Sequence, residues 1–171
     1  MIKIKLANES KAEVLALLSR VTYVESHGHF IENKNDLSKY TNQSFSVAKT
    51  KKNLTDPRHR FYIIYSDELP VGYAKLVLND NHESIESPNA CRLERIYILK
   101  DFIPMKVGQA LLNFVETKAK ALAFDTIWLS TYIKNLRAIK FYQKNKFQNV
   151  GELNYLVNGK EYENIIFSKK I

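Results

Sequence analysis

The order in which strand-like and helix-like patterns follow one another constrains the fold of this chain more than any other feature. Residues 2–6 alternate between apolar side chains and lysine, as in a half-buried strand, whereas the apolar residues after Val107 recur at helical spacing. Turn residues separate the segments. Strands are expected at 2–6, 61–65, 71–78, 91–99, 126–130, 147–156 and 161–167. Helices are expected over 10–21, 45–54, 107–123 and 135–144, and residues 25–36 read as a polar loop with a short helix starting near Asn35. This order predicts a mixed α/β (α+β) sheet of about seven strands flanked by about four helices.

Length, composition and cysteine content indicate one domain spanning residues 1–171. A chain of 171 residues is close to the size of a single domain, and its 45% hydrophobic residues exclude wholesale disorder. The one cysteine, Cys91, excludes an intramolecular disulfide and a multi-cysteine zinc finger. No apolar run is long enough to cross a bilayer, and the first residues lack a secretory signal core. We therefore expect a cytoplasmic protein with no membrane partner.

The formal net charge of +8 is unevenly distributed along the chain. Residues 100–146 contain nine lysines or arginines and three acids, so this segment alone carries +6. A phosphate-bearing ligand, a nucleic acid or plain solvated surface would each suit such a segment. No RNP motif or zinc-finger spacing is present, so we expect no nucleic-acid partner, and the alternative would show as binding that weakens steeply with salt. His27 and His29 lack an evident third ligand, so we expect no metal.

The most informative stretch, residues 93–111, reads as a strand, a loop and the start of a helix. A helix start offers unpaired backbone N–H groups and a positive dipole end, which suit a pyrophosphate. Together with a downstream motif, Asn135-x-x-Ala138-x-x-Phe141-Tyr142-x-x-x-x-Phe147, this stretch resembles the GNAT acetyltransferase superfamily. The resemblance implies the GNAT fold, acetyl-CoA as cosubstrate, and direct acetyl transfer to an amine without a covalent acetyl-enzyme.

The same resemblance assigns the cofactor-binding residues. The strand before the loop would pair its backbone with pantetheine, the loop and the helix start would bind the pyrophosphate, and the asparagine would contact the cofactor: Ile96, Tyr97, Ile98, Ile103, Pro104, Met105, Lys106, Val107, Gly108, Gln109, Ala110 and Asn135. Only Gly108 matches the family's loop pattern, Gln/Arg-x-x-Gly-x-Gly/Ala; Ile103 lacks the polar side chain and Lys106 replaces a glycine. A catalytically weak or inactive CoA-binding module therefore remains an alternative.

Two residues are candidates for moving protons. Tyr142 corresponds to the family's usual general acid, and a tyrosine hydroxyl with a pKa of about 10 can protonate the departing thiolate. Glu94 is the candidate base that accepts the proton of the attacking amine through water. A carboxylate paired with Arg92 or Arg95 is the alternative interpretation of Glu94.

Within the superfamily, the chain looks most like the bacterial PaiA-type polyamine N-acetyltransferases. The similar segments include Gly28-His29, Val71-Gly72-Tyr73-Ala-Lys-Leu76 and Leu156-Val157-Asn158-Gly159. The resemblance implies a small-molecule amine substrate, with spermidine or spermine leading. A polycation needs carboxylates, and the expected acceptor-binding residues are Glu25, His29 and Glu32. A protein N-terminus, an amino acid or an aminoglycoside is left open as the acceptor, and a homodimer is possible.

Overall fold

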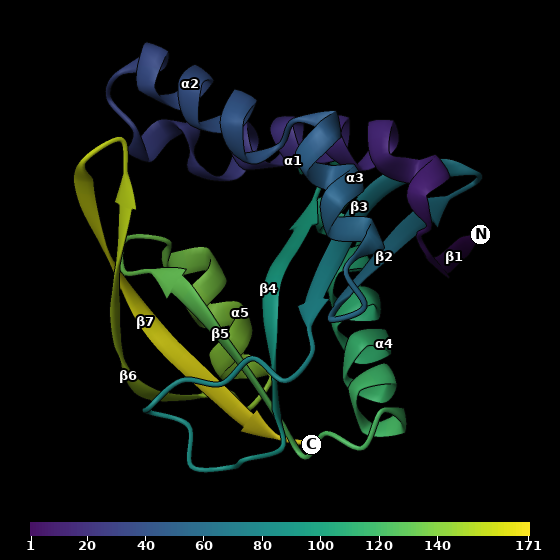
Figure 1. Cartoon of the computed structure of the whole chain (residues 1–171), viewed down its shortest axis with the longest axis vertical. Coiled ribbons are helices and arrows are strands. Elements are labelled where there is room, and N and C mark those ends of the chain that lie inside the picture. The colour runs from purple at the N-terminus through teal and green to yellow at the C-terminus, as the bar shows by residue number, and fades with distance from the viewer. The chain divides into compact units, whose positions relative to one another are not determined.

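A computed structural model describes residues 1–171 and contains one seven-stranded sheet. The strands are β1 (Ile2–Leu6), β2 (His59–Ser66), β3 (Leu69–Val77), β4 (Ala90–Ile98), β5 (Thr126–Tyr132), β6 (Gln148–Val157) and β7 (Lys160–Lys170). They are hydrogen-bonded in the order β1-β2-β3-β4-β5-β7-β6 (Figure 1). β4 and β5 are parallel, whereas the pairs β1–β2, β5–β7 and β6–β7 are antiparallel. The predicted mixed sheet is therefore confirmed.

Five α-helices accompany the sheet, which agrees with the expectation of about four helices. They are α1 (Ala12–His27), α2 (Lys34–Ser44), α3 (Val47–Thr55), α4 (Val107–Ala121) and α5 (Leu136–Lys144). Short 3₁₀ helices cover Glu9–Lys11, Gly28–Phe30 and Lys100–Met105. The region 35–54 forms two helices because Ser46 begins a new one, its hydroxyl accepting the N–H of Lys49 at 3.2 Å. None of the helices combines the length and apolar character that a membrane crossing requires.

The internal contacts divide the chain into two compact units. The first unit contains Met1–Leu76 and Arg95–Val115, and the second contains Val77–Glu94 and Glu116–Ile171. β4 contributes its first half to the second unit and its second half to the first. The predicted cofactor loop belongs to the first unit and Tyr142 belongs to the second.

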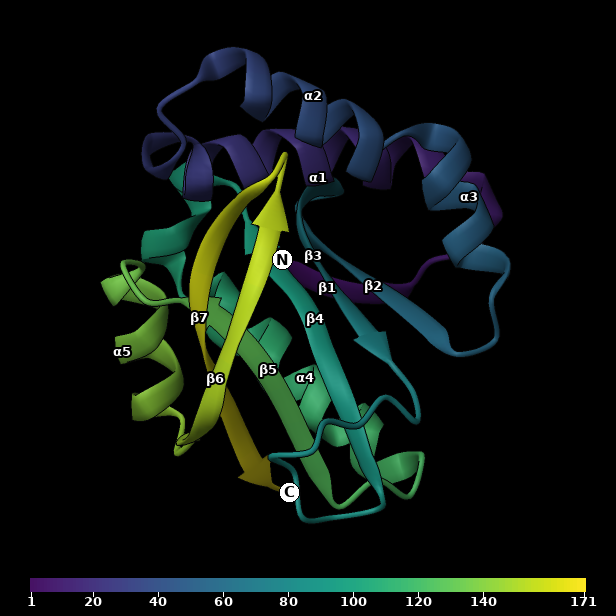
Figure 2. The ribbon, with the colours of Figure 1, turned by 60° about the vertical axis from the view of Figure 1, so that its left-hand side comes forward.

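The core of the first unit forms where α1 packs against β2 and β3. Leu15 and Leu18 project from one face of α1, as their helical spacing predicts, and contact Phe61, Ile63 and Tyr73. All five side chains are buried. α2 and α3 follow one another along α1, as Figure 2 shows. The second half of β4 belongs to this same packed unit.

The sequence pattern placed residues 25–36 in a polar loop with a helix starting near Asn35, and this expectation is wrong for the first three of those residues. α1 continues to His27, whose ring stacks on Tyr23 at a centroid distance of 4.7 Å. α2 then begins at Lys34, because the Asn33 side chain accepts the N–H of Asn35 at 2.9 Å. Ring packing from one turn to the next thus extends a helix through residues that look polar in isolation.

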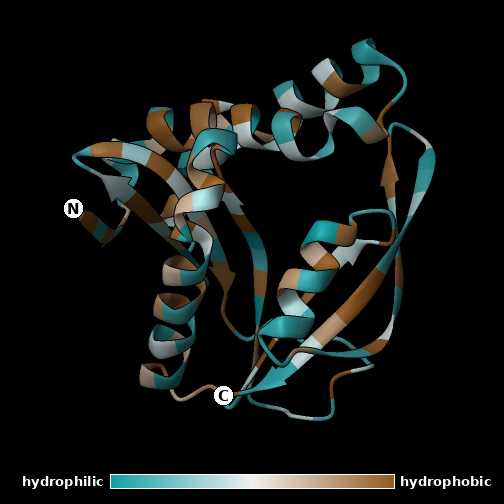
Figure 3. Ribbon diagram, turned by 180° about the vertical axis from the view of Figure 1, so that it is seen from behind, coloured by the Kyte–Doolittle hydropathy of each residue, from teal (hydrophilic) through white to brown (hydrophobic).

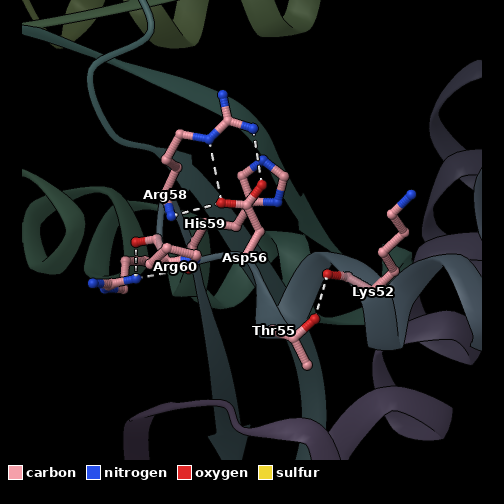
Figure 4. Close-up of polar contacts among 7 residues, drawn as sticks. Lys52, Thr55, Asp56, Arg58, His59 and Arg60 are labelled. Atoms are coloured by element: carbon pink, nitrogen blue, oxygen red, sulfur yellow. Dashed lines mark hydrogen bonds and ion pairs between the residues drawn. The ribbon is translucent and has the colours of Figure 1, made fainter.

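The link between α3 and β2 is built from local polar contacts (Figure 4). The Asp56 carboxylate accepts the backbone N–H of Arg58 at 2.9 Å and two guanidinium N–H groups of the same residue. These hydrogen bonds hold the pKa of Asp56 well below its usual value. Arg60 donates to the carbonyl of Pro57 at 2.6 Å. His59, which the sequence pattern placed in a loop, is the first residue of β2.

The core of the second unit surrounds Trp128, which lies in the apolar strand expected at 126–130. Trp128 packs with Ile85, Ala90 and Ile166, and its indole N–H donates to the carbonyl of Asp80 at 2.6 Å. Figure 3 shows the apolar part of β7 as a brown band that gives way to hydrophilic residues at the C-terminus. Cys91 is fully buried and burial raises its thiol pKa to about 12, so it acts as a small hydrophobic residue.

Candidate functional site

The ladder between β4 and β5 is short, and it ends where the sequence predicts the cofactor strand to begin. Its register covers Ala90 to Arg92, which lie opposite Thr126 to Trp128. β4 itself continues from Leu93 to Ile98. Backbone N–H and C=O groups are strong hydrogen-bonding groups that need partners. A strand that continues beyond its paired residues can therefore bind an extended ligand through its main chain.

On its other edge, the second half of β4 lies unusually close to β3. A Cβ atom added to Gly72 would lie 2.5 Å from the carbonyl oxygen of Tyr97 and from Cδ1 of Ile98. The N–H of Leu99 donates to the carbonyl of Val71 at 2.9 Å. Only glycine allows this approach at position 72. The contact fixes Tyr97 and Ile98 just before the chain enters the predicted phosphate loop.

The loop itself is the 3₁₀ helix Lys100–Met105 followed by Lys106 and the first turn of α4. Lys106 has φ 58 and ψ 19, the left-handed region that favours glycine. Its N–H donates to the carbonyl of Ile103 at 3.3 Å, and its own carbonyl accepts the N–H groups of Gln109 and Ala110. The loop therefore adopts a glycine-type turn although a lysine occupies the position.

The first turn of α4 provides the donors that a pyrophosphate needs. Helix geometry leaves the amides of Val107 and Gly108 without an intrahelical acceptor, at the positive end of the helix dipole. A Cβ atom at Gly108 would meet only Cγ1 of Ile98, at an ordinary contact distance of 3.6 Å. The exposed Lys106 lies directly before this turn. The two amides and the ammonium group fit a phosphate-bearing ligand.

An aromatic cluster that sequence reasoning missed holds Tyr97 against α1. The Tyr97 ring lies 6.4 Å from Tyr23, 5.8 Å from His27 and 6.0 Å from Tyr73. Burial, followed by the neighbouring tyrosines, raises the pKa of Tyr97 well above its usual value. No residue spacing in the sequence predicts this cluster, because its members come from three separate elements, α1, β3 and β4.

The surroundings of Glu94 bear on the alternative interpretation of that residue. Arg92 hydrogen-bonds the Tyr155 hydroxyl and forms a 3.7 Å ion pair with Asp80, and its guanidinium lies 4.7 Å from the Trp128 ring. Arg95 lies over the Phe45 ring at 4.8 Å. Both arginines thus have partners other than Glu94. The proposed role of Glu94 as a base remains a prediction.

The motif Asn135 to Phe147 forms α5 and the turn that follows it. The Asn135 side-chain oxygen caps the helix by accepting the N–H of Ala138 at 3.2 Å. Because the oxygen is used in this way, the amide NH₂ group is the part left to contact a ligand. Tyr142 packs against Phe147 and Phe167 at centroid distances of 5.6 and 6.1 Å. The tyrosine is 8% exposed, and burial raises its pKa above the usual value.

The expected acceptor-binding residues lie at the end of α1 and just beyond it. His29 and Glu32 are exposed, and the His29 ring packs on Phe30 at 3.8 Å. Glu25 is also exposed, but its carboxylate accepts the backbone N–H of Lys100 at 2.9 Å. The structure thus links Glu25 to the predicted phosphate loop. No group of three or more histidine, cysteine, aspartate or glutamate residues is arranged to hold a metal ion.

Comparison with known proteins places the chain in a family. The acetyltransferase (GNAT) family model matches residues 23–147. An uncharacterized N-acetyltransferase from Lactobacillus delbrueckii subsp. lactis is 24% identical over 170 residues, which cover 99% of this chain and 98% of the relative. A protein of Bacillus subtilis subsp. natto described as a probable spermine N(1)-acetyltransferase is 28% identical over 70% of this chain and 82% of its own length.

A solved structure agrees with this placement. The PaiA N-acetyltransferase of Thermoplasma acidophilum, solved in complex with coenzyme A, superposes with a TM-score of 0.76. Its sequence is 19% identical, and the match covers 100% of this chain and 99% of the other. The chain belongs to the acetyltransferase (GNAT) family. It is an acyltransferase, an N-acetyltransferase that uses acetyl-CoA as its cosubstrate.

Proposed function

We propose that this enzyme acetylates a primary amine of a small molecule, with a polyamine as the leading acceptor, by direct transfer in a ternary complex. The observation that carries the proposal is the left-handed turn at Lys106, which leads directly into the first turn of α4, where helix geometry leaves N–H groups without an intrahelical acceptor. This turn keeps the form of a phosphate loop where the sequence pattern looks degenerate. It therefore supports binding of acetyl-CoA, which the proposed reaction requires.

Acetyl-CoA supplies the acetyl group as a thioester, and the protein's part is to bind and orient it. The main chain of Ile96, Tyr97 and Ile98 would pair with the pantetheine, and one of these amides would polarise the thioester carbonyl. The pyrophosphate would be bound by the loop and the start of α4, and Asn135 would contact the cofactor. The residues of this loop and helix start are Ile103, Pro104, Met105, Lys106, Val107, Gly108, Gln109 and Ala110.

Two side chains would move the protons of the reaction. Glu94 would accept the proton of the attacking amine through a water molecule. The Tyr142 hydroxyl would then give its proton to the departing thiolate. A tyrosine hydroxyl, with an ordinary pKa of about 10, is protonated at neutral pH, as a general acid must be before the reaction begins. Burial raises the pKa of Tyr142 and makes it a weaker acid, so this assignment rests on the position of Tyr142 in the family motif.

The relative described as a probable spermine N(1)-acetyltransferase supports a polyamine as acceptor. The exposed Glu32 carboxylate and the His29 ring would face the ammonium groups of such a substrate. We propose that residues 1–171 act as a single acetyltransferase domain, since the Lactobacillus relative matches 99% of the chain. The homodimer and the cytoplasmic location stay predictions.

Calorimetric titration with acetyl-CoA, followed by an amine panel, tests the proposal. Micromolar binding, equivalent to about −8 kcal/mol, is expected. The panel compares spermidine and spermine with free amino acids, an aminoglycoside and a peptide bearing a free N-terminus. Preferential turnover of the polyamines supports the proposal, whereas preference for a peptide or an amino acid contradicts the acceptor. Binding of acetyl-CoA without turnover of any amine would identify an inactive CoA-binding module, and absence of binding at millimolar acetyl-CoA would mean that the loop has lost its ligand.

A further inference from the structure

We infer that Glu25 is a positioning residue for the phosphate loop, and that its carboxylate sets the affinity for acetyl-CoA by fixing where the loop begins. The inference rests on the proposed function and deepens it. It gives Glu25 a different role from the acceptor ligand that the sequence suggested. The role is visible only in the structure, because Glu25 and the loop are 75 residues apart along the chain.

The contact involves the last turn of α1 and the first residue of the loop. Oε2 of Glu25 accepts the backbone N–H of Lys100 at 2.9 Å. Lys100 begins the 3₁₀ helix, and the residue before it, Leu99, provides no side-chain cap. The first N–H groups of a helix have no partner within it. The Glu25 carboxylate therefore serves as the missing cap, supplied by a different element.

The hydrogen bond from Lys100 to Glu25 is one of several neighbouring contacts that hold the end of β4 against β3 and α1. The N–H of Leu99 donates to β3, at the carbonyl of Val71, and the next N–H, that of Lys100, donates to Glu25. The same end of α1 packs on β4 through Tyr23 and His27. The chain is thus held on both sides of the point where β4 becomes the loop.

The position of Lys100 determines where the phosphate-binding amides lie. From Lys100 the chain runs through one 3₁₀ helix to the left-handed Lys106 and into α4. A hydrogen bond to a carboxylate is charge-assisted and stronger than a neutral one, so it holds the loop more firmly than a water molecule would. Glu25 is exposed and lies outside the core formed by Leu15 and Leu18. Removing its carboxylate should therefore shift the loop without unfolding the protein.

The test compares Glu25→Ala and Glu25→Gln with the wild type and with Glu13→Ala. Glu13 lies at the exposed start of the same helix, so its replacement removes an identical charge away from the loop. In calorimetric titrations we expect Glu25→Ala to bind acetyl-CoA about tenfold more weakly. Glu25→Gln keeps an acceptor oxygen and should fall between Glu25→Ala and the wild type. Glu13→Ala should bind like the wild type.

Steady-state kinetics separate positioning from acceptor binding. A positioning role predicts that Glu25→Ala raises KM for acetyl-CoA while KM for spermidine stays unchanged. The opposite split, with a raised spermidine KM and an unchanged acetyl-CoA affinity, would overturn the inference and return Glu25 to the acceptor site. Amide exchange gives a readout that needs no ligand: the Lys100 N–H should exchange faster in Glu25→Ala. Equal protection in both proteins would likewise overturn the inference.

These outcomes are distinguishable from failure of the proposed function. If the wild type takes up no acetyl-CoA, the proposed function fails, and the inference fails with it. If the wild type binds acetyl-CoA and Glu25→Ala binds it equally well, only the role of Glu25 is refuted. A thermal unfolding curve of each variant confirms that the proteins compared are folded.

Discussion

Replacing Lys106 by glycine tests the phosphate loop most directly, because it affects both backbone conformation and charge. With φ 58, Lys106 occupies the left-handed region, which costs a residue with a Cβ atom about 1–2 kcal/mol. Glycine removes that cost but loses about 0.5–1 kcal/mol more conformational entropy on folding. The net stabilisation of about 0.5–1 kcal/mol should raise the unfolding midpoint by roughly 1–4 °C in a chain of this size.

The same substitution removes an ammonium group beside the proposed pyrophosphate site. An exposed ion pair contributes at most about 1 kcal/mol, so the Kd for acetyl-CoA should rise by about two- to fivefold. The difference should shrink as salt is added, because salt screens exposed charges. Lys106→Gly is thus expected to be more stable and to bind acetyl-CoA more weakly than the wild type.

Two further variants separate the conformational and electrostatic contributions. Lys106→Ala removes the charge and keeps a Cβ atom in the left-handed region, so it should weaken binding without raising the unfolding midpoint. Lys146 also has a positive φ, 66°, in the turn between α5 and β6. Lys146→Gly should therefore stabilise the protein and leave acetyl-CoA binding unchanged. Scanning calorimetry and isothermal titration of the three variants measure both quantities.

Two results would refute this reasoning. If Lys106→Gly bound acetyl-CoA more tightly than the wild type, the lysine would obstruct the loop rather than contribute to it. If neither glycine variant gained stability, the left-handed backbone would carry no measurable cost at these positions. Comparing the two glycine variants identifies which premise fails.

Replacing Tyr142 by phenylalanine should lower kcat by about a hundredfold and leave the Kd for acetyl-CoA unchanged, and an unaltered rate would exclude Tyr142 as the acid. Gly72→Ala should destabilise the protein by about 1–3 kcal/mol, because the new Cβ atom meets the main chain of Tyr97. Gly108→Ala, whose Cβ atom has room, is the control. Equal urea midpoints for the two variants would contradict the close approach of β3 and β4 at Gly72. Burial raises the pKa of Tyr97 and of Tyr142 above the value of about 10 in an unfolded chain. Their contribution to stability is therefore complete below about pH 10 and is lost as the pH rises from there toward the folded-state pKa values. The unfolding midpoint should fall as the pH is raised above about 10, and less steeply for Tyr142→Phe.

The elements that the sequence predicted well are those whose signals are local. The Asn158-Gly159 pair predicted a type I′ hairpin, and both residues have positive φ, 50° and 81°. Trp128 stands in an apolar strand and Cys91 near the start of another strand, and both are buried, as those positions predict. In each case, neighbours within a few positions determine the outcome, so periodicity and turn chemistry are sufficient.

The features that the sequence did not reveal depend on residues far apart along the chain. The Glu25 carboxylate is attached to Lys100, and Tyr97 is enclosed by rings from α1 and β3. The family pattern showed a lysine where glycine was expected, but it could not show that Lys106 keeps the conformation of a glycine. Tertiary contacts around a loop can impose a backbone conformation that the residue itself disfavours.

The early end of the β4–β5 ladder has a consequence for how this binding site can change over time. Beyond Arg92, the groups that β4 would offer to the cosubstrate in the proposed binding mode are main-chain amides and carbonyls. Every residue carries them, except that proline lacks the N–H. Side chains on this strand that take no part in packing or proton transfer could therefore be exchanged while the proposed recognition surface stays the same. A site of this kind would tolerate wide sequence divergence, as between this chain and a relative that is 24% identical.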